Sequence, residues 1–436
     1  MLKSFILSLL LFCSFTTAFA QLQFNSLAEV IQYADQHATV AREAVLYKSS
    51  AQQDAALQTA TLLPKLSGFS TADYYPIIAS QLIPASFFGS KSDEYKKVQF
   101  GLPFIVTAGL ELSMPIINFE KWETVAKTKA QVNQVQSNQN AVLENMHLQL
   151  TQFYFQYLVY KKLQALNQQN EADAQHVLEV MQLRFKQDLL NPADLNRYIN
   201  MHIDIQNAGL QYAKAQQQAQ LNLQNILNQS AAPIVISDSI SNFTFPDWKG
   251  DASTISYRPA LAEMNWRYAM AQHTLAESRR AVLPKLALYS KYAYNWQMRF
   301  DPNTHAGYDV NSIGLKLDVP LFNGTFNAHQ MQKSAIQLQI AGLEKERISN
   351  QLLQQQHEWE NSYRIARLQN SSLQQKLSNC NENLRIALLQ VKEGVMEVEE
   401  FNTVYRDYLK TQMDYYQNLT DGILFYTLLQ QTTQTH

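Results

Sequence analysis

This chain of 436 residues has few cysteines, few glycines and almost no net charge. Its two cysteines are Cys13 and Cys380, and the first lies in an N-terminal segment that we expect to be removed. The single thiol that remains excludes an internal disulfide and suggests no metal cluster. Glycine, at 12 residues, forms no linker-like run. A net charge of -2 gives no basic surface of the kind that binds nucleic acid.

The chain also lacks the residue patterns of enzymes and cofactor sites. Its nine histidines are scattered without the spacing of paired metal ligands, and no glycine-rich phosphate loop or nucleophile elbow occurs. The sequence therefore predicts no enzyme activity, no cofactor and no metal. Cys380 lies on a predicted helical seam with Leu377 and Leu384, so a core position is its simplest assignment.

Long apolar runs are missing after the first 20 residues. No later segment has about 18 consecutive apolar residues, so no transmembrane helix is expected. Residues 1–20 have the form of a signal peptide: Lys3 precedes an apolar stretch, and Ala18-Phe19-Ala20 is a cleavage site. An uncleaved anchor is the alternative, but the stretch is short for one. A secreted chain of this kind is periplasmic, extracellular or an outer-membrane strand protein.

What the chain does have is an internal duplication. Leu63-Pro64-Lys65-Leu66 recurs as Leu283-Pro284-Lys285-Leu286, at an offset of 283 minus 63, or 220 residues. Residues 109–118 match residues 314–323 at five positions, at an offset of 314 minus 109, or 205. Because the offsets differ by 15, the connection between these segments is longer in the first copy, as an exposed loop tolerates.

Most of each copy is predicted to be helical. Ser26-Leu27-Ala28-Glu29 has the pattern of a capping box, and a helix is expected from there to Leu62. Residues 119–186 lack Pro and Gly and predict a helix of about 100 Å, with 328–393 as its equivalent. Apolar residues step by three and four along both, as in a coiled coil. Helices return over 193–228 and 398–430, so each copy ends in a helical hairpin.

Each copy also carries a pair of strand patterns, at about residues 66–115 and 286–319. Along 286–300 and 313–319, apolar residues alternate with polar ones. The alternation fits either a sheet over a soluble core or a membrane barrel with an apolar exterior and a polar lumen. The signal peptide and the Tyr and Trp content favour the barrel. Residues 76–103 are predicted to be a long loop.

These patterns divide the chain into a signal peptide (1–20), a first repeat (21–228), an irregular connector (229–252) and a second repeat (253–436). The fold class is mainly α, with four antiparallel strands per chain. A bilayer accepts only closed barrels, because open sheet edges leave backbone groups unsatisfied. Known barrels begin at about eight strands. The chain must therefore associate, and rotational symmetry is the default.

The duplication, the Leu-Pro-Lys-Leu start of each strand pair, its Gly-Leu-x-Leu-x-x-Pro end and Arg258-Pro259-Ala260-Leu261 together resemble the TolC-like outer-membrane efflux proteins. The resemblance covers essentially the whole mature chain, and its first long loop resembles that of Bacteroidetes members. It implies a homotrimer, whose three chains of four strands close a barrel of twelve above a helical tunnel. It further implies that the periplasmic tips dock on an adaptor linked to an inner-membrane pump.

The function implied is passive conduction of exported substrates across the outer membrane, in tripartite efflux or type I secretion, without chemistry in this subunit. Family members commonly have glycine at the first step of each hairpin tip. Gly394 keeps it, whereas Asp188 replaces it in the first copy. Aspartate tolerates the left-handed conformation better than most residues, so we expect that turn to form.

The resemblance places a closed entrance, lined by acidic residues, at the periplasmic tips. The tip and entrance candidates are Asp188, Leu189, Leu190, Asp194, Glu393, Gly394, Val395, Met396, Glu397, Glu399 and Glu400. Rings of acids bias pores toward cations, although solvated tip charge is the simpler interpretation of any one acid. The apolar tip residues could meet the adaptor or pack within the trimer.

Strand alternation assigns two further sets of residues. The barrel lumen is expected to be faced by Glu111, Lys291, Arg299, Lys316 and Asp318, and the lipid or its rim by Tyr292, Tyr294 and Trp296. The alternative function is a periplasmic coiled-coil adaptor or another structural helical protein without a membrane barrel. That alternative explains the helical seams but not the duplicated strands.

Overall fold

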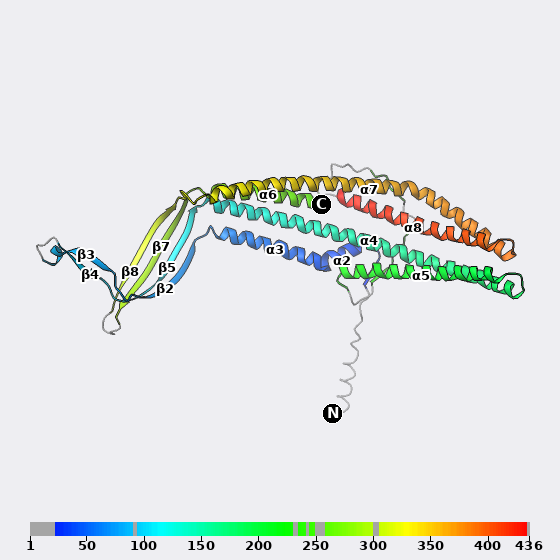
Figure 1. Ribbon diagram of the computed structural model, residues 1–436, viewed down its shortest axis with the longest axis horizontal. Helices are drawn as coiled ribbons and strands as arrows, with labels where there is room; N and C mark the ends of the chain where they lie inside the picture. The colour runs from blue at the N-terminus through cyan, green and yellow to red at the C-terminus, as the bar shows by residue number, and fades with distance from the viewer. Residues whose placement is uncertain are drawn as a thin grey trace, which may run out of the picture. The chain divides into compact units, whose positions relative to one another are not determined.

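The computed structural model describes residues 22–89, 94–229, 234–240, 244–248, 258–299 and 305–433. The predicted signal peptide and part of the predicted connector lie outside these ranges. The helices, shown in Figure 1, are α2 (Leu27–His37), α3 (Thr39–Ala60), α4 (Phe119–Lys186), α5 (Pro192–Ile226), α6 (Pro259–Arg280), α7 (Phe326–Glu393) and α8 (Val398–Thr433). Among the described residues, no helix is both long and apolar enough to cross a membrane.

The strands are β1 (Leu22–Phe24), β2 (Lys65–Tyr74), β3 (Ser80–Pro84), β4 (Tyr95–Gln99), β5 (Phe104–Ile117), β6 (Ile234–Ile236), β7 (Lys285–Met298) and β8 (His305–Asp318). The chain divides into two compact units, one of residues 1–48, 135–264 and 345–436, the other of residues 49–134 and 265–344. Each unit contains segments of both copies of the duplication.

The second unit contains a four-stranded sheet in the order β2-β5-β7-β8 (Figure 1). All three strand pairings are antiparallel, and a register shift between Pro115 and Ile117 interrupts the β5–β7 pairing. The fold class predicted from the sequence, mainly helical with four antiparallel strands, is confirmed. The sheet has two open edges, β2 and β8.

The prediction of a plain loop over residues 76–103 is wrong. Strands β3 and β4 pair there with Ser80 opposite Gln99, and a short 3-10 helix, η1 (Ala85–Phe88), follows β3. The segment escaped detection because each strand has only five residues and Leu82 and Ile83 are adjacent, which breaks the period of two.

The predicted connector is also more regular than expected. Its residues Ile234–Ile236 form β6, which pairs in parallel with β1 at the start of the described chain. Strands of three residues are too short to leave a periodic signal. The pairing fixes the connector against the N-terminal segment, 210 or more positions away in sequence.

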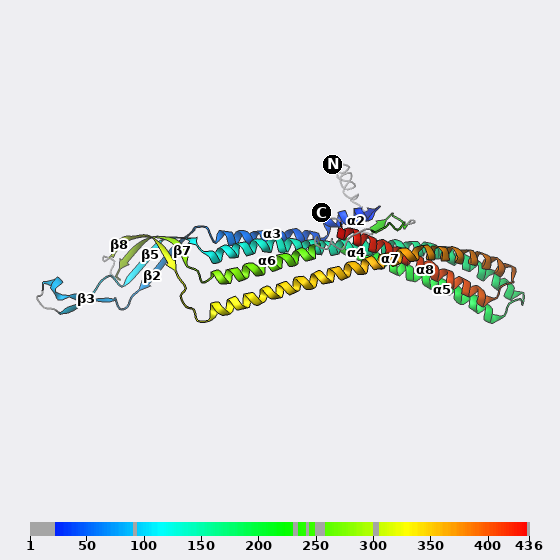
Figure 2. The ribbon, with the colours of Figure 1, turned by 90° about the horizontal axis from the view of Figure 1, so that it is seen from above.

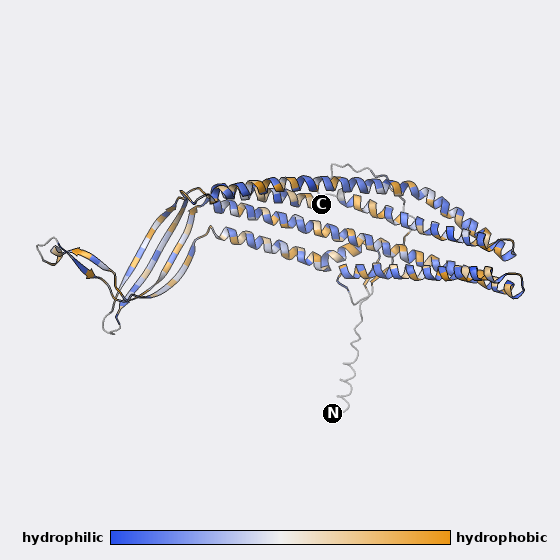
Figure 3. Ribbon diagram, in the orientation of Figure 1, coloured by the Kyte–Doolittle hydropathy of each residue, from blue (hydrophilic) through white to orange (hydrophobic). Residues whose placement is uncertain are grey.

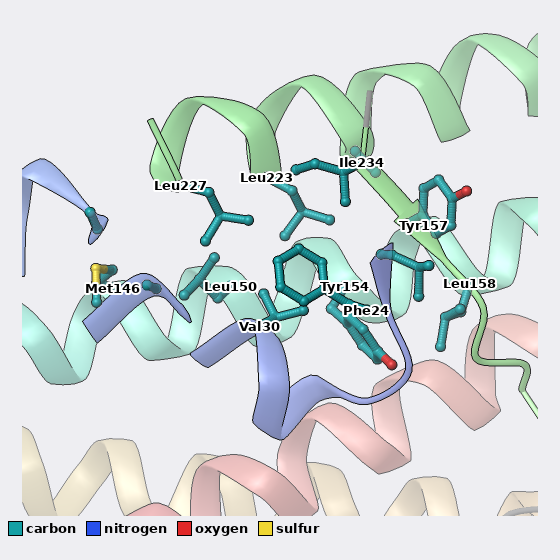
Figure 4. Close-up of a cluster of buried hydrophobic side chains, with 14 of the residues drawn as sticks. Phe24, Val30, Met146, Leu150, Tyr154, Tyr157, Leu158, Leu223, Leu227 and Ile234 are labelled. Carbon is teal, nitrogen blue, oxygen red and sulfur yellow. The ribbon is translucent and has the colours of Figure 1, made fainter. Parts of the chain in front are cut away.

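An apolar core lies where β1, β6, α2, α4 and α5 meet in the first unit (Figure 4). Tyr154 and Leu150 of α4 are fully buried in it, against Val30 of α2 and Leu223 of α5. The Tyr154 hydroxyl donates to Asp238 Oδ2 at 2.6 Å. Burial, and this bond to a carboxylate, raise the pKa of Tyr154. The ring therefore stays neutral and anchors the connector to α4.

A buried ion pair lies beside the first turn of α6 in the same unit. Arg258 Nε is 3.1 Å from Glu144 Oε1 of α4, and both side chains are largely buried. The Arg258 guanidinium also lies over the Trp359 ring of α7, 5.4 Å from its centroid. Burial raises the pKa of Glu144, and the charges of Arg258 and His147 oppose that rise. The arginine of the Arg-Pro-Ala-Leu motif thus joins three helices.

Candidate functional site

The two hairpin tips adopt the same backbone turn. At the end of α4, Asp188 has a φ of 58° and Leu189 N donates to Arg184 O at 3.0 Å. At the end of α7, Gly394 has a φ of 75° and Val395 N donates to Gln390 O at 3.0 Å. A left-handed residue followed by such a six-to-one bond is the Schellman way to end a helix. Asp188 therefore takes the conformation that glycine has at the other tip.

Arg184 connects the two tips. Its Nη2 donates to Lys392 O, in the last turn of α7, at 2.9 Å. Cations at a helix C-terminus are favourable because the unpaired carbonyls there carry partial negative charge. A Cβ atom at position 394 would clash with the Arg184 guanidinium. Gly394 thus adopts its positive φ at low cost, and any side chain there would have to displace the Arg184 guanidinium.

A second set of charges joins the N-terminal parts of α5 and α8. Arg197 Nη1 lies 3.4 Å from Asp194 Oδ1 and 3.7 Å from Glu399 Oε2. Arg406 Nη2 lies 3.6 Å from Glu399 Oε1. Arg197, Glu399 and Arg406 border a groove of about 220 Å³ between α5 and α8. The charged side chains of this set are about half exposed or more, apart from Asp194, so each pair contributes little stability and mainly orients the others.

Beneath the tips, the four helices share an apolar core (Figure 2 shows the hairpins α4–α5 and α7–α8 side by side). Tyr198, Phe401 and Tyr405 are fully buried in it. Burial, reinforced by the charge of Asp194, raises the pKa of Tyr198 to about 12. The Tyr405 hydroxyl donates to Asn170 O at 2.8 Å, across from α8 to α4. The core holds the two tip turns in a fixed relation.

The predicted tip residues fall into three groups. Leu189 and Val395 are more than 70% exposed, whereas Leu190 and Met396 pack against the core of the hairpins. Asp194 has a structural role, because its carboxylate accepts from the amide of the capping Asn191 and lies 3.4 Å from Arg197 Nη1. The remaining predicted acids, except Glu399, are exposed and have no ion-pair partner among the described residues; they are Asp188, Glu393, Glu397 and Glu400.

Arg184, Arg197 and Arg406 were not predicted to be tip residues. The contacts of Arg184 with Lys392 and of Arg197 with Glu399 join distant segments, and only the repeat predicts that these segments lie close together. The pairs Arg197–Asp194 and Arg406–Glu399 are local, and their spacing was the signal that could have indicated them. Within the described part of the chain, no group of three or more His, Cys, Asp or Glu side chains could hold a metal ion.

The sheet separates the predicted lumen and lipid residues onto opposite faces. Residues directly opposite each other in a sheet share a face. Glu111 lies opposite Lys291, and Asp318 lies opposite Lys285, on one face that also carries Lys316. We call this the polar face. Arg299 lies one residue beyond the end of β7 and has no register partner in the described sheet.

The opposite face, which we call the apolar face, carries the predicted lipid residues. Tyr292 lies opposite Leu110 and Trp296 opposite Val106, and Tyr294 lies between them on the same strand. Tyr294 and Trp296 form an edge-on ring pair with centroids 4.4 Å apart. Along β7 and β8, hydrophilic and hydrophobic residues alternate (Figure 3). Leu315 and Leu317 of β8 extend the apolar face and are more than 60% exposed.

Comparison with protein families matches residues 253–422 to the family described as outer membrane efflux protein. Comparison with curated proteins finds no match. Solved structures with the same fold include a membrane protein from Pseudomonas aeruginosa, with 16% identity and a TM-score of 0.76, covering 94% of this chain and 93% of that one.

Two outer membrane proteins are similar to the same degree. The CmeC outer membrane channel of Campylobacter jejuni has 13% identity and a TM-score of 0.76, covering 93% of this chain and 85% of its own. The outer membrane protein VceC of Vibrio cholerae has 14% identity and a TM-score of 0.75, covering 93% and 95%. At such identities the likeness establishes the fold.

Proposed function

We propose that this chain, which belongs to the TolC-like outer membrane efflux proteins, is one of three identical subunits that enclose a single export conduit. As a member of this family it is an outer-membrane efflux channel with a large helical part in the periplasm. The trimer, the lumen and the acidic entrance are part of this proposal.

One observation carries the proposal: the four-stranded sheet has two open edges and two chemically different faces. An open edge cannot stay in lipid, because its backbone donors and acceptors would be unsatisfied there. Three chains of four strands give twelve, which is within the range of closed membrane barrels. The apolar face, with Tyr292 and Trp296, would then meet lipid, and the polar face, with Glu111 and Lys316, would line the lumen.

The hairpin tips are proposed to receive the export machinery. Leu189 and Val395 are the most exposed apolar residues there, at 71% and 74%. Because isolated exposed apolar side chains at matching turns offer a small, repeated docking surface, we assign them to contact with a periplasmic adaptor, which links the channel to an inner-membrane pump. Leu190 and Met396, which pack inward, are assigned to the subunit itself.

The exposed tip acids are proposed to set the entrance. A threefold axis would repeat Asp188, Glu393, Glu397 and Glu400 as rings of negative charge, which favour cations in a pore. Cargo would pass through the subunit without a chemical step.

The test combines location, mass and conductance. The full chain is expected in the outer membrane fraction, at the mass of three chains in detergent, and to give discrete conductance steps in planar bilayers. A soluble periplasmic monomer without conductance would contradict the proposal and favour the alternative of a coiled-coil adaptor or structural helical protein.

A further inference from the structure

We propose that β8 of one copy pairs with β2 of the next in one defined register, in which Lys316 lies opposite Thr71 of the neighbouring copy. The inference rests on the proposed trimer and specifies its contact. It follows from the equivalent strand pairing of the two copies of the duplication.

The two copies of the duplication pair their strands identically. In the first copy, Lys65 of β2 lies opposite Ser113 of β5. Adding the repeat offsets, 220 to Lys65 and 205 to Ser113, gives Lys285 and Asp318. These two residues are indeed opposite each other in the β7–β8 pair of the second copy. The repeat is therefore a structural equivalence, residue for residue, within the sheet.

The pair β5–β7 is the junction between the first copy and the second within one chain. Its register places Glu111 opposite Lys291. The equivalent junction between chains joins the second copy of one chain to the first copy of the next. Adding 205 to Glu111 gives Lys316 of β8, and subtracting 220 from Lys291 gives Thr71 of β2. The internal junction thus serves as the template for the contact between copies.

Side chains alternate between the two faces of a strand, and this alternation restricts the possible registers between β8 and β2. Thr71 lies opposite Thr107, which lies opposite Asn295, so Thr71 belongs to the polar face with Lys316. A slip of one residue would pair the polar face of one chain with the apolar face of the next. Only slips of two residues keep the faces continuous, and they would place Lys316 opposite Phe69 or Asp73.

The exposure of apolar residues supports the proposed register. Within the chain, Ile117 lies opposite Leu286 at the end of the β5–β7 pair. Adding 205 to Ile117 and subtracting 220 from Leu286, as before, places Phe322 opposite Leu66 of the neighbouring copy. Phe322 is 88% exposed, its neighbour Leu321 91% and Leu66 65%. Leu66 belongs to the apolar face, and Leu321 and Phe322 follow the end of β8, so in the assembled barrel lipid or the neighbouring chain would cover them. The proposed register brings the two edges' apolar residues together.

Disulfide cross-linking in outer membranes tests the register. Lys316 and Thr71 lie on opposite edge strands of the sheet, three strand spacings or about 14 Å apart across it. Thr71 is in line with Tyr308 of β8, so the two residues are also separated by eight positions, roughly 26 Å, along the strands. A disulfide between them must therefore join two chains. In a Cys380→Ser background, Lys316→Cys with Thr71→Cys is expected to give covalent trimers on oxidation. The slipped pairs, Lys316→Cys with Phe69→Cys or with Asp73→Cys, are displaced by roughly 7 Å and are expected to give several-fold less.

Two further variants make every outcome informative. Asp318→Cys with Phe69→Cys is a second pair in the same register, in case the first folds poorly. Glu111→Cys with Lys291→Cys is the matched control at the internal junction and is expected to cross-link within one chain. Stronger cross-linking by a slipped pair would overturn the register while leaving the trimer. No cross-linking between chains, with the control cross-linked, would overturn the direct β8–β2 contact.

The mass of the unmodified protein separates this inference from the proposed function. A trimer by mass photometry without cross-links between chains would contradict the β8–β2 contact proposed here and leave the trimer intact. A monomer would contradict the proposed function itself.

Discussion

Position 394 illustrates how a single residue can be constrained twice. The backbone needs a φ of 75°, and the guanidinium of Arg184 occupies the volume of any side chain. We expect Gly394→Ala to cost about 1–2 kcal/mol from the backbone alone, with a further loss from displacing Arg184. Thermal unfolding of the purified protein measures this as a lower Tm.

Gly342→Ala is the matched control for that prediction. Gly342 lies within α7, and a Cβ there would make only an ordinary 3.6 Å contact with Tyr268. Because alanine favours a helix over glycine by about 0.5–1 kcal/mol, this variant is expected to raise Tm. If both variants shift Tm alike, the special role of Gly394 is wrong.

The buried pair of Glu144 and Arg258 gives a second prediction at this scale. Arg258→Ala leaves Glu144 buried and uncompensated, and we expect a loss of about 3–5 kcal/mol. Replacing both by apolar residues of similar size is expected to cost much less, so a double-mutant cycle should show strong coupling. Unfolding monitored by helical circular dichroism measures both.

The control is Arg367→Ala, whose arginine pairs with Asp247 at the surface, where both side chains are 45% or more exposed. It is expected to lose less than about 1 kcal/mol. Equal losses at positions 258 and 367 would show that burial of the Glu144 pair does not matter.

At the scale of elements, the strand faces lead to a prediction about membrane insertion. Leu315 is on the apolar face, and Lys316, one residue on, is on the polar face. Leu315→Arg is expected to cost up to about 2–4 kcal/mol near the middle of the bilayer, and less near its surface, and so to reduce outer-membrane protein. Lys316→Arg carries the same guanidinium on the other face and should insert normally. Quantitative immunoblots of membrane fractions compare the two.

How far the elements could be predicted depended on their length. Helix α4 lacks Pro and Gly over 68 residues, α7 has the same length with a single glycine, and the paired strands of 14 residues alternate clearly, so the fold class followed from periodicity. The hairpin β3–β4 and the pair β1–β6 could not be found, because three to five residues carry too little periodic signal. The predicted lumen and lipid residues of the strands fall on opposite faces. Which face meets lipid stays a prediction.

The candidate site was predictable only in part for a related reason. Apolar and acidic residues near helix ends can be read from the sequence, and so can the glycine of the second tip. The inward packing of Leu190 and Met396 and the bridges from Arg184 to Lys392 and from Arg197 to Glu399 depend on contacts between distant segments. No local spacing encodes such contacts.

At the scale of the whole molecule, the tip acids predict ion selectivity. Replacing Glu393, Glu397 and Glu400 by Gln and Asp188 by Asn removes four charges per chain. The open channel should then lose part of its preference for cations, because the fixed negative field at the entrance is weaker. Reversal potentials in planar bilayers under a salt gradient measure this preference.

Its matched control is the same number of Gln and Asn replacements at exposed acids away from the tip turns, namely Glu43, Asp54, Glu346 and Glu358. These should leave the reversal potential as it is in the parent. An unchanged potential in the tip variant would show that those acids do not govern the entrance.

The identical pairing of the two strand pairs has one more consequence. If the β8–β2 contact between chains repeats the β5–β7 junction within a chain, each half of the polypeptide carries both of the strand edges that pair with each other. A half-length gene product could then assemble as a ring of six, and today's subunit would be two ancestral units joined by fusion. Each half of a fused chain would be free to diverge, and among the described residues the hairpin β3–β4 is a feature of the first half.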